Sequence, residues 1–221
     1  MPTSDIIYLI LLLCISMLGS IVFKKLKPPF KVLVVLICVT LVSEIIARVM
    51  GRTIRNSNPV YHFFNIAELL LYALMYRHLL QGRLMHRLIA IAAVVIPAFA
   101  LFNLFVLQPL LTFPSNVILV NYCVIILIAI AYFRQMLMLP SRVNILAEET
   151  FWLNALIILY CSYGFITLAL YNYMRGHGIN REIINTLAYF LNVIMYIGMG
   201  ITTYINYRNN SKQPMAWGVV K

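Results

Sequence analysis

The sequence predicts an all-α fold, a polytopic bundle of seven transmembrane helices. Of its 221 residues, 63% are hydrophobic and only 10% are charged, whereas a soluble domain has about 45–50% apolar and about 25% charged residues. Seven stretches also approach the roughly 20 apolar residues that a helix needs to cross a bilayer. This composition excludes a soluble enzyme and a disordered chain, because a soluble chain of this length could not hide the apolar surplus.

The seven stretches follow one another with short connections, and we expect each to form one helix, since backbone polar groups inside a bilayer must be satisfied internally. Together they form a single transmembrane domain over residues 1–207, followed by a short polar cytoplasmic tail over residues 208–221. The predicted spans are residues 6–23, 32–50, 60–80, 88–107, 117–139, 151–173 and 183–207.

Residues that cap or break helices lie between these spans, in the order that seven helices require. Prolines lack a backbone N–H and cannot continue a helix. Asn or Ser next to a proline is typical of a helix start. The fourth span contains Pro97, where we expect a kink. The boundary signals are Pro28-Pro29 before the second span, Asn58-Pro59 before the third, Pro114-Ser115-Asn116 before the fifth, Gly176-His177-Gly178 after the sixth and Asn180 before the seventh.

Basic residues are unequally divided between the two ends of the predicted bundle, and Lys and Arg favour the cytoplasmic side. This imbalance predicts that the N-terminus is outside, the C-terminus is cytoplasmic and the protein lies in a bacterial inner membrane. We therefore attribute the net charge of +11 to the bilayer as partner and expect no nucleic acid. Twelve basic residues lie on one side (Lys24, Lys25, Lys27, Lys31, Arg77, Arg83, Arg87, Arg134, Arg142, Arg208, Lys212, Lys221) and five on the other (Arg48, Arg52, Arg55, Arg175, Arg181).

Two carboxylates lie inside predicted spans, where a charge costs roughly 2.5–3.5 kcal/mol and tends to be paired or functional. Glu44 is in the second span and Glu68 is in the third, and we expect both in the outer half of the bilayer. Glu44 is four residues from Arg48, so the two can form an ion pair on one helix face. By contrast, Glu148 and Glu149 precede the sixth span, where acids complement the helix dipole.

Polar side chains follow Glu68 at helical spacing, and the last span carries a similar stripe. Two interpretations stand: hydrogen bonds that join helices, or a cavity in the outer half that binds an unidentified small ligand or ion, with Glu68 as the central acceptor. The candidate ligand-binding residues are Glu44, Arg48, Tyr61, His62, Asn65, Glu68, Tyr72, Tyr189 and Asn192.

We expect neither a metal site nor a cofactor. His62 is close to two carboxylates, but a zinc ion in a protein usually has three or four protein ligands. His78 and His86 flank a cytoplasmic loop and His177 lies on an outer loop, so no second histidine supports a site within the membrane. The four cysteines all fall inside spans and show no metal-binding spacing, so they are expected to act as small apolar residues. Glycines at positions 164, 198 and 200 are expected to allow close helix packing.

The order of three motifs resembles an uncharacterised family of bacterial seven-helix membrane proteins. The motifs are Ser43-Glu44-Ile45-Ile46-Ala47-Arg48, Tyr61-His62-Phe63-Phe64-Asn65-Ile66-Ala67-Glu68, and Phe151-Trp152-Leu153-Asn154 with Tyr160 and Gly164. The resemblance covers most of the chain, and it implies a fold but no activity.

Short connections leave no space for a catalytic module between the helices, so we expect a sensory, signalling or accessory subunit that reports ligand occupancy to a membrane protein partner. A small-solute transporter is the alternative, and it needs a cavity that opens on both sides. A lipid-modifying membrane enzyme is a third reading, for which no nucleophile, base or metal set is evident.

Overall fold

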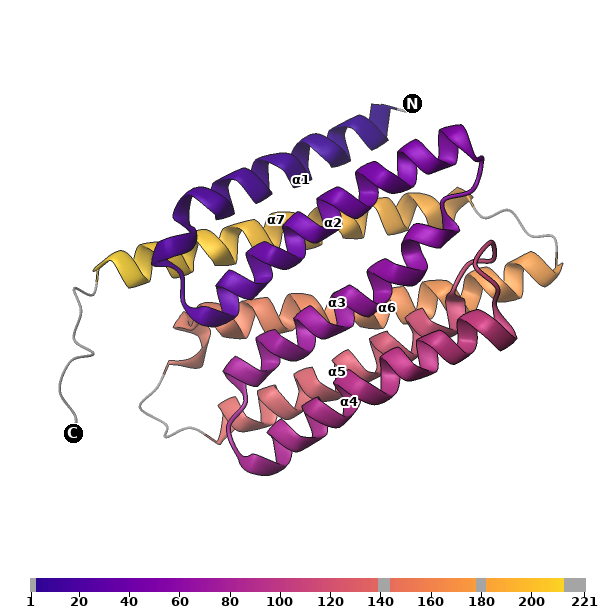
Figure 1. Cartoon of the computed structure of the whole chain (residues 1–221). Coiled ribbons are helices and arrows are strands. Elements are labelled where there is room, and N and C mark those ends of the chain that lie inside the picture. The colour runs from indigo at the N-terminus through magenta and orange to yellow at the C-terminus, as the bar shows by residue number, and fades with distance from the viewer. Residues whose placement is uncertain (1–2, 139–143, 178–181, 213–221) are drawn as a thin grey trace.

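The computed structural model describes residues 3–138, 144–177 and 182–212, apart from the side chains of residues 3–5, 171–185, 187, 188 and 212 (Figure 1). Within these ranges the chain forms seven α-helices and no strand, so the predicted all-α fold and helix number are confirmed. Each helix lies within five residues of its predicted limits. The helices are α1 Thr3–Val22, α2 Pro28–Thr53, α3 Asn58–Leu79, α4 Arg83–Phe102, α5 Ser115–Leu137, α6 Glu149–His177 and α7 Glu182–Lys212.

Successive helices run antiparallel and pack around a closed ring (Figure 1). Each helix packs on its neighbour in sequence, and α7 closes the ring by packing against α1 and, more weakly, α2. Helix α3 also packs on α5 directly. Because the number of helices is odd, the two termini lie at opposite ends of the bundle (Figure 1). We call these the N-terminal end and the C-terminal end.

The helix starts follow the predicted signals, with one shift. Helix α2 begins at the two prolines, and α5 begins directly after Pro114. Ser57 rather than Asn58 is the residue that precedes α3, and the Asn58 backbone N–H donates to Asn56 Oδ1 at 2.9 Å. The first N–H of the helix is therefore bonded by an asparagine two residues before the predicted cap, outside the helix. The predicted cap at residue 180 and residues 213–221 of the predicted tail lie outside the described residues, whereas residues 208–212 of that tail form the end of α7.

Helix α4 continues into a π-helical turn, Asn103–Leu107, that the sequence did not predict. Asn103 is fully buried there, and its Nδ2 donates to Gln108 Oε1 at 3.0 Å while its Oδ1 accepts from Asn116 Nδ2 at 3.2 Å. Gln108 Nε2 in turn donates to Ser115 Oγ at 2.8 Å. These side-chain bonds replace the helical ones that a widened turn disrupts, and they join α4 to α5.

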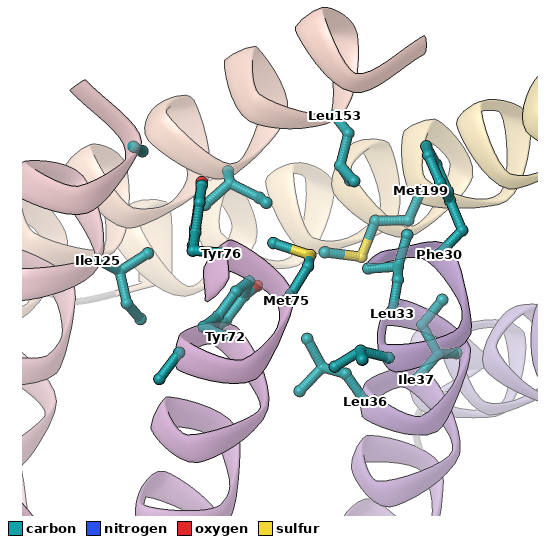
Figure 2. Packing of buried hydrophobic residues seen from close by; sticks show 14 of the residues in the cluster. Phe30, Leu33, Leu36, Ile37, Tyr72, Met75, Tyr76, Ile125, Leu153 and Met199 are labelled. Carbon is teal, nitrogen blue, oxygen red and sulfur yellow. The ribbon is translucent and has the colours of Figure 1, made fainter. Parts of the chain in front are cut away.

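The core between the helices is apolar and aromatic. Figure 2 shows Met75 of α3 and Met199 of α7 at its centre, with Leu33 and Ile37 of α2 and Leu153 of α6 around them. All of them are at most 1% exposed. The long side chains of α3 therefore fill the space between the two sides of the ring.

Large apolar side chains also cover the outside of the bundle. Exposed examples are Ile21 at 78%, Val94 at 70% and Phe105 at 81%, and apolar surface on this scale marks contact with a membrane or a protein. Five helices are long and apolar enough to cross a membrane: α1 with the short turn that follows it, α2, α4 with its π-helical turn, α5, and α6 as far as residue 170. The remaining two, α3 and α7, carry the polar stripes described above.

Candidate functional site

Glu68 lies at the middle of α3, ten residues after the first residue of that helix and eleven before the last. It therefore lies about midway along α3, and its position in the outer half of the bilayer stays a prediction. The residue is only 7% exposed. Among the residues that the structure describes, no ion pair or hydrogen bond reaches its carboxylate, and a buried carboxylate without partners is strongly unfavourable.

Tyrosines of three further helices lie within electrostatic range of Glu68. Its carboxylate interacts electrostatically with Tyr122 of α5, Tyr160 and Cys161 of α6, and Tyr196 of α7. Tyr72, one turn later on α3, completes this group and is 2% exposed. We call Tyr72, Tyr122, Tyr160 and Tyr196 the tyrosine ring. Of these, the sequence predicted only Tyr72 as a site residue.

The hydroxyls of the tyrosine ring interact with one another and with neighbours. Tyr122 pairs with Tyr160, with ring centroids 6.0 Å apart and edge to face. Tyr196 pairs with Tyr8 of α1, at 5.8 Å between centroids, and with Thr40 of α2. The hydroxyls of Tyr122, Tyr160 and Tyr196 therefore have partners other than Glu68.

Glycine 164 explains how Tyr122 approaches α6. A Cβ atom at this position would lie 2.5 Å from Tyr122 Cε2, far inside van der Waals contact. Gly198 plays the same role against Leu156, with 2.5 Å to Leu156 Cδ1, whereas a Cβ on Gly200 would make ordinary contact with Ile15 at 3.4 Å. Close packing at Gly164 and Gly198 therefore agrees with the role predicted for them.

The turn of α3 before Glu68 carries the predicted residues Tyr61, His62 and Asn65. His62 and Asn65 are each 4% exposed. His62 Nε2 lies 3.0 Å from the carbonyl oxygen of Thr112, in the connection between α4 and α5. Asn65 Nδ2 donates to the Tyr61 carbonyl oxygen at 2.7 Å. His62 therefore joins α3 to the α4–α5 connection, whereas the Asn65 side chain bonds within its own helix.

Asn121 of α5 was not a predicted site residue, but it lies directly against this turn. Its Nδ2 donates to the Asn65 carbonyl oxygen at 2.9 Å, and it is 1% exposed. Its Oδ1 is buried without a hydrogen-bond partner among the described residues. The sequence shows this asparagine on an apolar helix, yet only the fold brings it within one turn of Glu68.

Glu44 and Arg48 form the predicted ion pair on α2, with 2.9 Å between Arg48 Nη1 and Glu44 Oε2. The Arg48 guanidinium also lies over the ring of Tyr8, 5.6 Å from its centroid. Tyr8 contacts Tyr196, so this pair connects to the tyrosine ring through two aromatic side chains. Glu44 and Glu68 both interact electrostatically with Tyr196.

Tyr189 and Asn192 of α7 are half-buried and share a helix face with Tyr196, because their spacing is three and then four residues. Tyr189 lies about two turns and Asn192 about one turn before Tyr196, toward the N-terminal end. The described ring contact of Tyr189 is with Phe190, at 5.7 Å between centroids. Further along this face, Tyr196 interacts electrostatically with the Glu68 carboxylate.

No group of three His, Cys, Asp or Glu side chains that could hold a metal ion occurs in the part of the chain that the structure describes.

A buried polar cluster at the C-terminal end differs from what the sequence predicted for Glu149. Glu149 is 3% exposed, and its Oε1 accepts from Lys27 Nζ at 2.8 Å and from Asn206 Nδ2 at 2.7 Å. Its Oε2 accepts from Asn209 Nδ2 at 3.1 Å, and the Lys27 backbone N–H donates to Asn206 Oδ1 at 3.1 Å. The helix dipole is therefore an incomplete explanation, since this carboxylate joins the α1–α2 connection to α6 and α7.

A second set of hydrogen bonds crosses the bundle between Glu149 and Glu68. The Tyr76 hydroxyl donates to Asn154 Oδ1 at 2.6 Å, and Asn154 Nδ2 donates to the Ala129 carbonyl oxygen at 3.0 Å. All three residues are at most 1% exposed. Buried polar groups therefore occur along the whole length of the bundle, and the predicted bias toward one half is only part of the pattern.

Replacing Tyr76 by phenylalanine is expected to lower the free energy of unfolding by about 1–3 kcal/mol, because Asn154 Oδ1 is left buried without a donor. Denaturant titration of the purified protein in mixed micelles measures this change. Tyr204, which is 62% exposed, offers the control, since Tyr204→Phe should change the free energy by less than about 0.5 kcal/mol. Equal effects of the two substitutions would contradict the role of the Tyr76 hydroxyl.

Comparison of the chain with protein families, with curated proteins and with solved structures finds no match. The resemblance to a bacterial seven-helix family thus stays a prediction from its motifs.

Proposed function

We propose that this chain is a multi-pass protein of the bacterial inner membrane, with the N-terminus outside and the C-terminus in the cytoplasm. Five long apolar helices and the exposed apolar side chains on the outside of the bundle support the membrane as its environment. The excess of Lys and Arg at the C-terminal end supports the orientation. All seven helices cross in this proposal, with α3 and α7 tolerating polar side chains because these face the interior.

We further propose that the protein binds a small positively charged solute, an amine, beside Glu68. The observation that carries the proposal is a pair of acceptors in this part of the bundle: Asn121 Oδ1, which is buried without a hydrogen-bond partner, and the carboxylate of Glu68, a residue that is 7% exposed. Neither has a donor among the described residues, and a ligand that donates hydrogen bonds supplies what is missing. A positive charge on that ligand also neutralises the carboxylate, which is costly when unpaired.

The tyrosine ring suits the same ligand. Aromatic faces attract an ammonium group through their quadrupole, an interaction of about 0.5–2 kcal/mol that grows as water is excluded. Glu68, Tyr122, Tyr160 and Tyr196 come from α3, α5, α6 and α7, so a bound amine contacts four helices. An amine with N–H donors is preferred over a quaternary ammonium, because only the former satisfies Asn121 Oδ1.

In this proposal the protein is a sensory or accessory subunit. Occupancy favours the arrangement of the four helices in which the ligand is bound best, and a membrane protein partner reads that arrangement through lateral helix contacts. The short connections between the described helices support a signal carried by the helices themselves.

The test is the melting temperature of the purified protein in detergent, measured with methylammonium, tetramethylammonium and sodium chlorides at equal ionic strength. A ligand specific for the native state stabilises it by about 2.7 kcal/mol at a hundredfold excess over its dissociation constant. We expect methylammonium to stabilise the wild type more than either other cation, and Glu68→Gln to remove that difference.

Glu148→Gln is the matched control, because it removes one carboxylate that is half-buried at the C-terminal end, twelve residues before Tyr160 of the tyrosine ring. This variant should keep the wild-type response to methylammonium. Identical responses of the wild type and Glu68→Gln would contradict the site.

A small-solute transporter is the second candidate. The continuation of buried polar side chains from Glu68 through Asn154 to Asn206 favours it, although hydrogen bonds engage those groups at the C-terminal end. Uptake of labelled methylammonium into proteoliposomes that depends on Glu68 would support transport, and binding without uptake would support the sensory role.

A further inference from the structure

A groove runs along the outside of the bundle where α1 and α2 diverge. It has a volume of about 530 Å³ and is lined on one side by Ser20, Phe23 and Lys24 and on the other by the α2 face from Val34 to Ser43. The α2 wall consists mainly of valines, with Cys38 among them. Close packing of Gly19 on Val34, where a Cβ would lie 2.8 Å from Val34 Cγ2, forms the junction from which the groove opens.

The length of the groove matches one leaflet of a membrane. The wall from Val34 to Ser43 spans nine residues and, at about 1.5 Å per residue, about 13 Å. Half of a hydrocarbon core of about 30 Å is about 15 Å. The groove also begins near the C-terminal end and reaches the middle of α2, whose limits are Pro28 and Thr53.

Lys24 lies where the groove begins, at the C-terminal end of the bundle. Lys27 pairs with Glu149, Lys25 lies over the ring of Tyr207 at 5.6 Å, and Lys31 lies over the ring of Phe23 at 6.0 Å. Within the described ranges, Lys24 has no ion pair, hydrogen bond or ring contact, and it lines the groove. A positive charge at the polar end of an apolar groove is complementary to an anionic headgroup above an acyl chain.

We infer that this groove binds one anionic phospholipid of the cytoplasmic leaflet, with an acyl chain along the α2 valines and the phosphate at Lys24. The inference rests on the proposed membrane location and orientation, but not on ligand binding at Glu68. Lys31 adds a second charge near the phosphate, because its Nζ contacts the ring of Phe23, another groove residue. The cytoplasmic leaflet supplies such lipids, since it carries the negative surface potential.

The test is native mass spectrometry of the purified protein titrated with phosphatidylglycerol or phosphatidylcholine of identical acyl chains. We expect the first phosphatidylglycerol to bind more tightly than phosphatidylcholine. Lys24→Gln should weaken phosphatidylglycerol about fivefold, the effect of one basic residue near an anionic surface, and leave phosphatidylcholine unchanged. Val39→Trp, which fills the groove, should weaken both lipids.

Lys25→Gln is the matched control, because it removes a neighbouring charge that contacts Tyr207 instead of the groove, and it should weaken phosphatidylglycerol less than Lys24→Gln does. Equal binding of both lipids, or equal effects of Lys24→Gln and Lys25→Gln, would overturn the inference and leave the membrane assignment intact. If neither lipid binds the wild type, the inference is overturned and the proposed membrane location is contradicted as well. The methylammonium response at Glu68 is measured separately.

Discussion

Replacing Glu149 by alanine is expected to lower the free energy of unfolding by about 3 kcal/mol, the lower end of the range for breaking a buried ion pair. The lower end applies because the Lys27 side chain is 44% exposed and regains water. Asn206, which is fully buried, loses the acceptor of its amide. Because Glu149 joins the α1–α2 connection to α6 and α7, the three segments should loosen together, and limited proteolysis between α1 and α2 should accelerate.

Glu148→Ala is the control for this experiment. Glu148 is the adjacent carboxylate, half-buried, and it takes part in none of the hydrogen bonds of the Lys27–Glu149–Asn206 cluster. Its removal should change the free energy of unfolding by less than about 1 kcal/mol, as surface charges do. Denaturant titration in mixed micelles measures the free energy of unfolding of both variants. A loss of stability in Glu148→Ala as large as that in Glu149→Ala would contradict the stabilising role of the Lys27–Glu149–Asn206 cluster.

Gly164→Leu is expected to be the second strongly destabilising substitution, at about 1–3 kcal/mol or more for inserting side-chain volume into a packed interior. Even a Cβ at position 164 would lie 2.5 Å from the Tyr122 ring, so leucine must displace that ring. Tyr122 then loses its edge contact with Tyr160, and the tyrosine ring opens on one side. We therefore expect lower stability and a weaker methylammonium response in the same variant.

Gly51→Leu shows what leucine does where there is room. A Cβ on Gly51 has nothing within 4 Å, and leucine favours a helix over glycine by up to about 1 kcal/mol. This variant should have a melting temperature in detergent equal to or above that of the wild type. If Gly164→Leu behaves like Gly51→Leu, the close approach of Tyr122 to α6 is wrong.

The number and limits of the helices could be predicted from the sequence because apolar length and proline position determine both. Pro114, for example, sets the start of α5 to within two residues of the prediction. The π-helical turn at Asn103 could not be predicted, since it depends on side-chain bonds from Gln108 and Asn116 that form only after α4 and α5 pack.

The candidate site was predictable only along single helices. Spacing placed Asn65, Glu68 and Tyr72 on one face of α3, and that face is buried. Spacing within a helix says nothing about which residues of other helices lie opposite, so Tyr122, Tyr160 and Asn121 were missed. The same reason explains Glu149, whose partners Lys27 and Asn206 come from the α1–α2 connection and from α7.

The most direct test of the central claim is infrared difference spectroscopy of the purified protein before and after adding methylammonium chloride. The account predicts a change in a side-chain carboxyl band, absent with sodium chloride and absent in Glu68→Gln, while Glu44→Gln and Glu149→Gln retain it. A methylammonium-induced carboxyl change that persists in Glu68→Gln, or no carboxyl change in the wild type at saturating methylammonium, would contradict Glu68 as the acceptor.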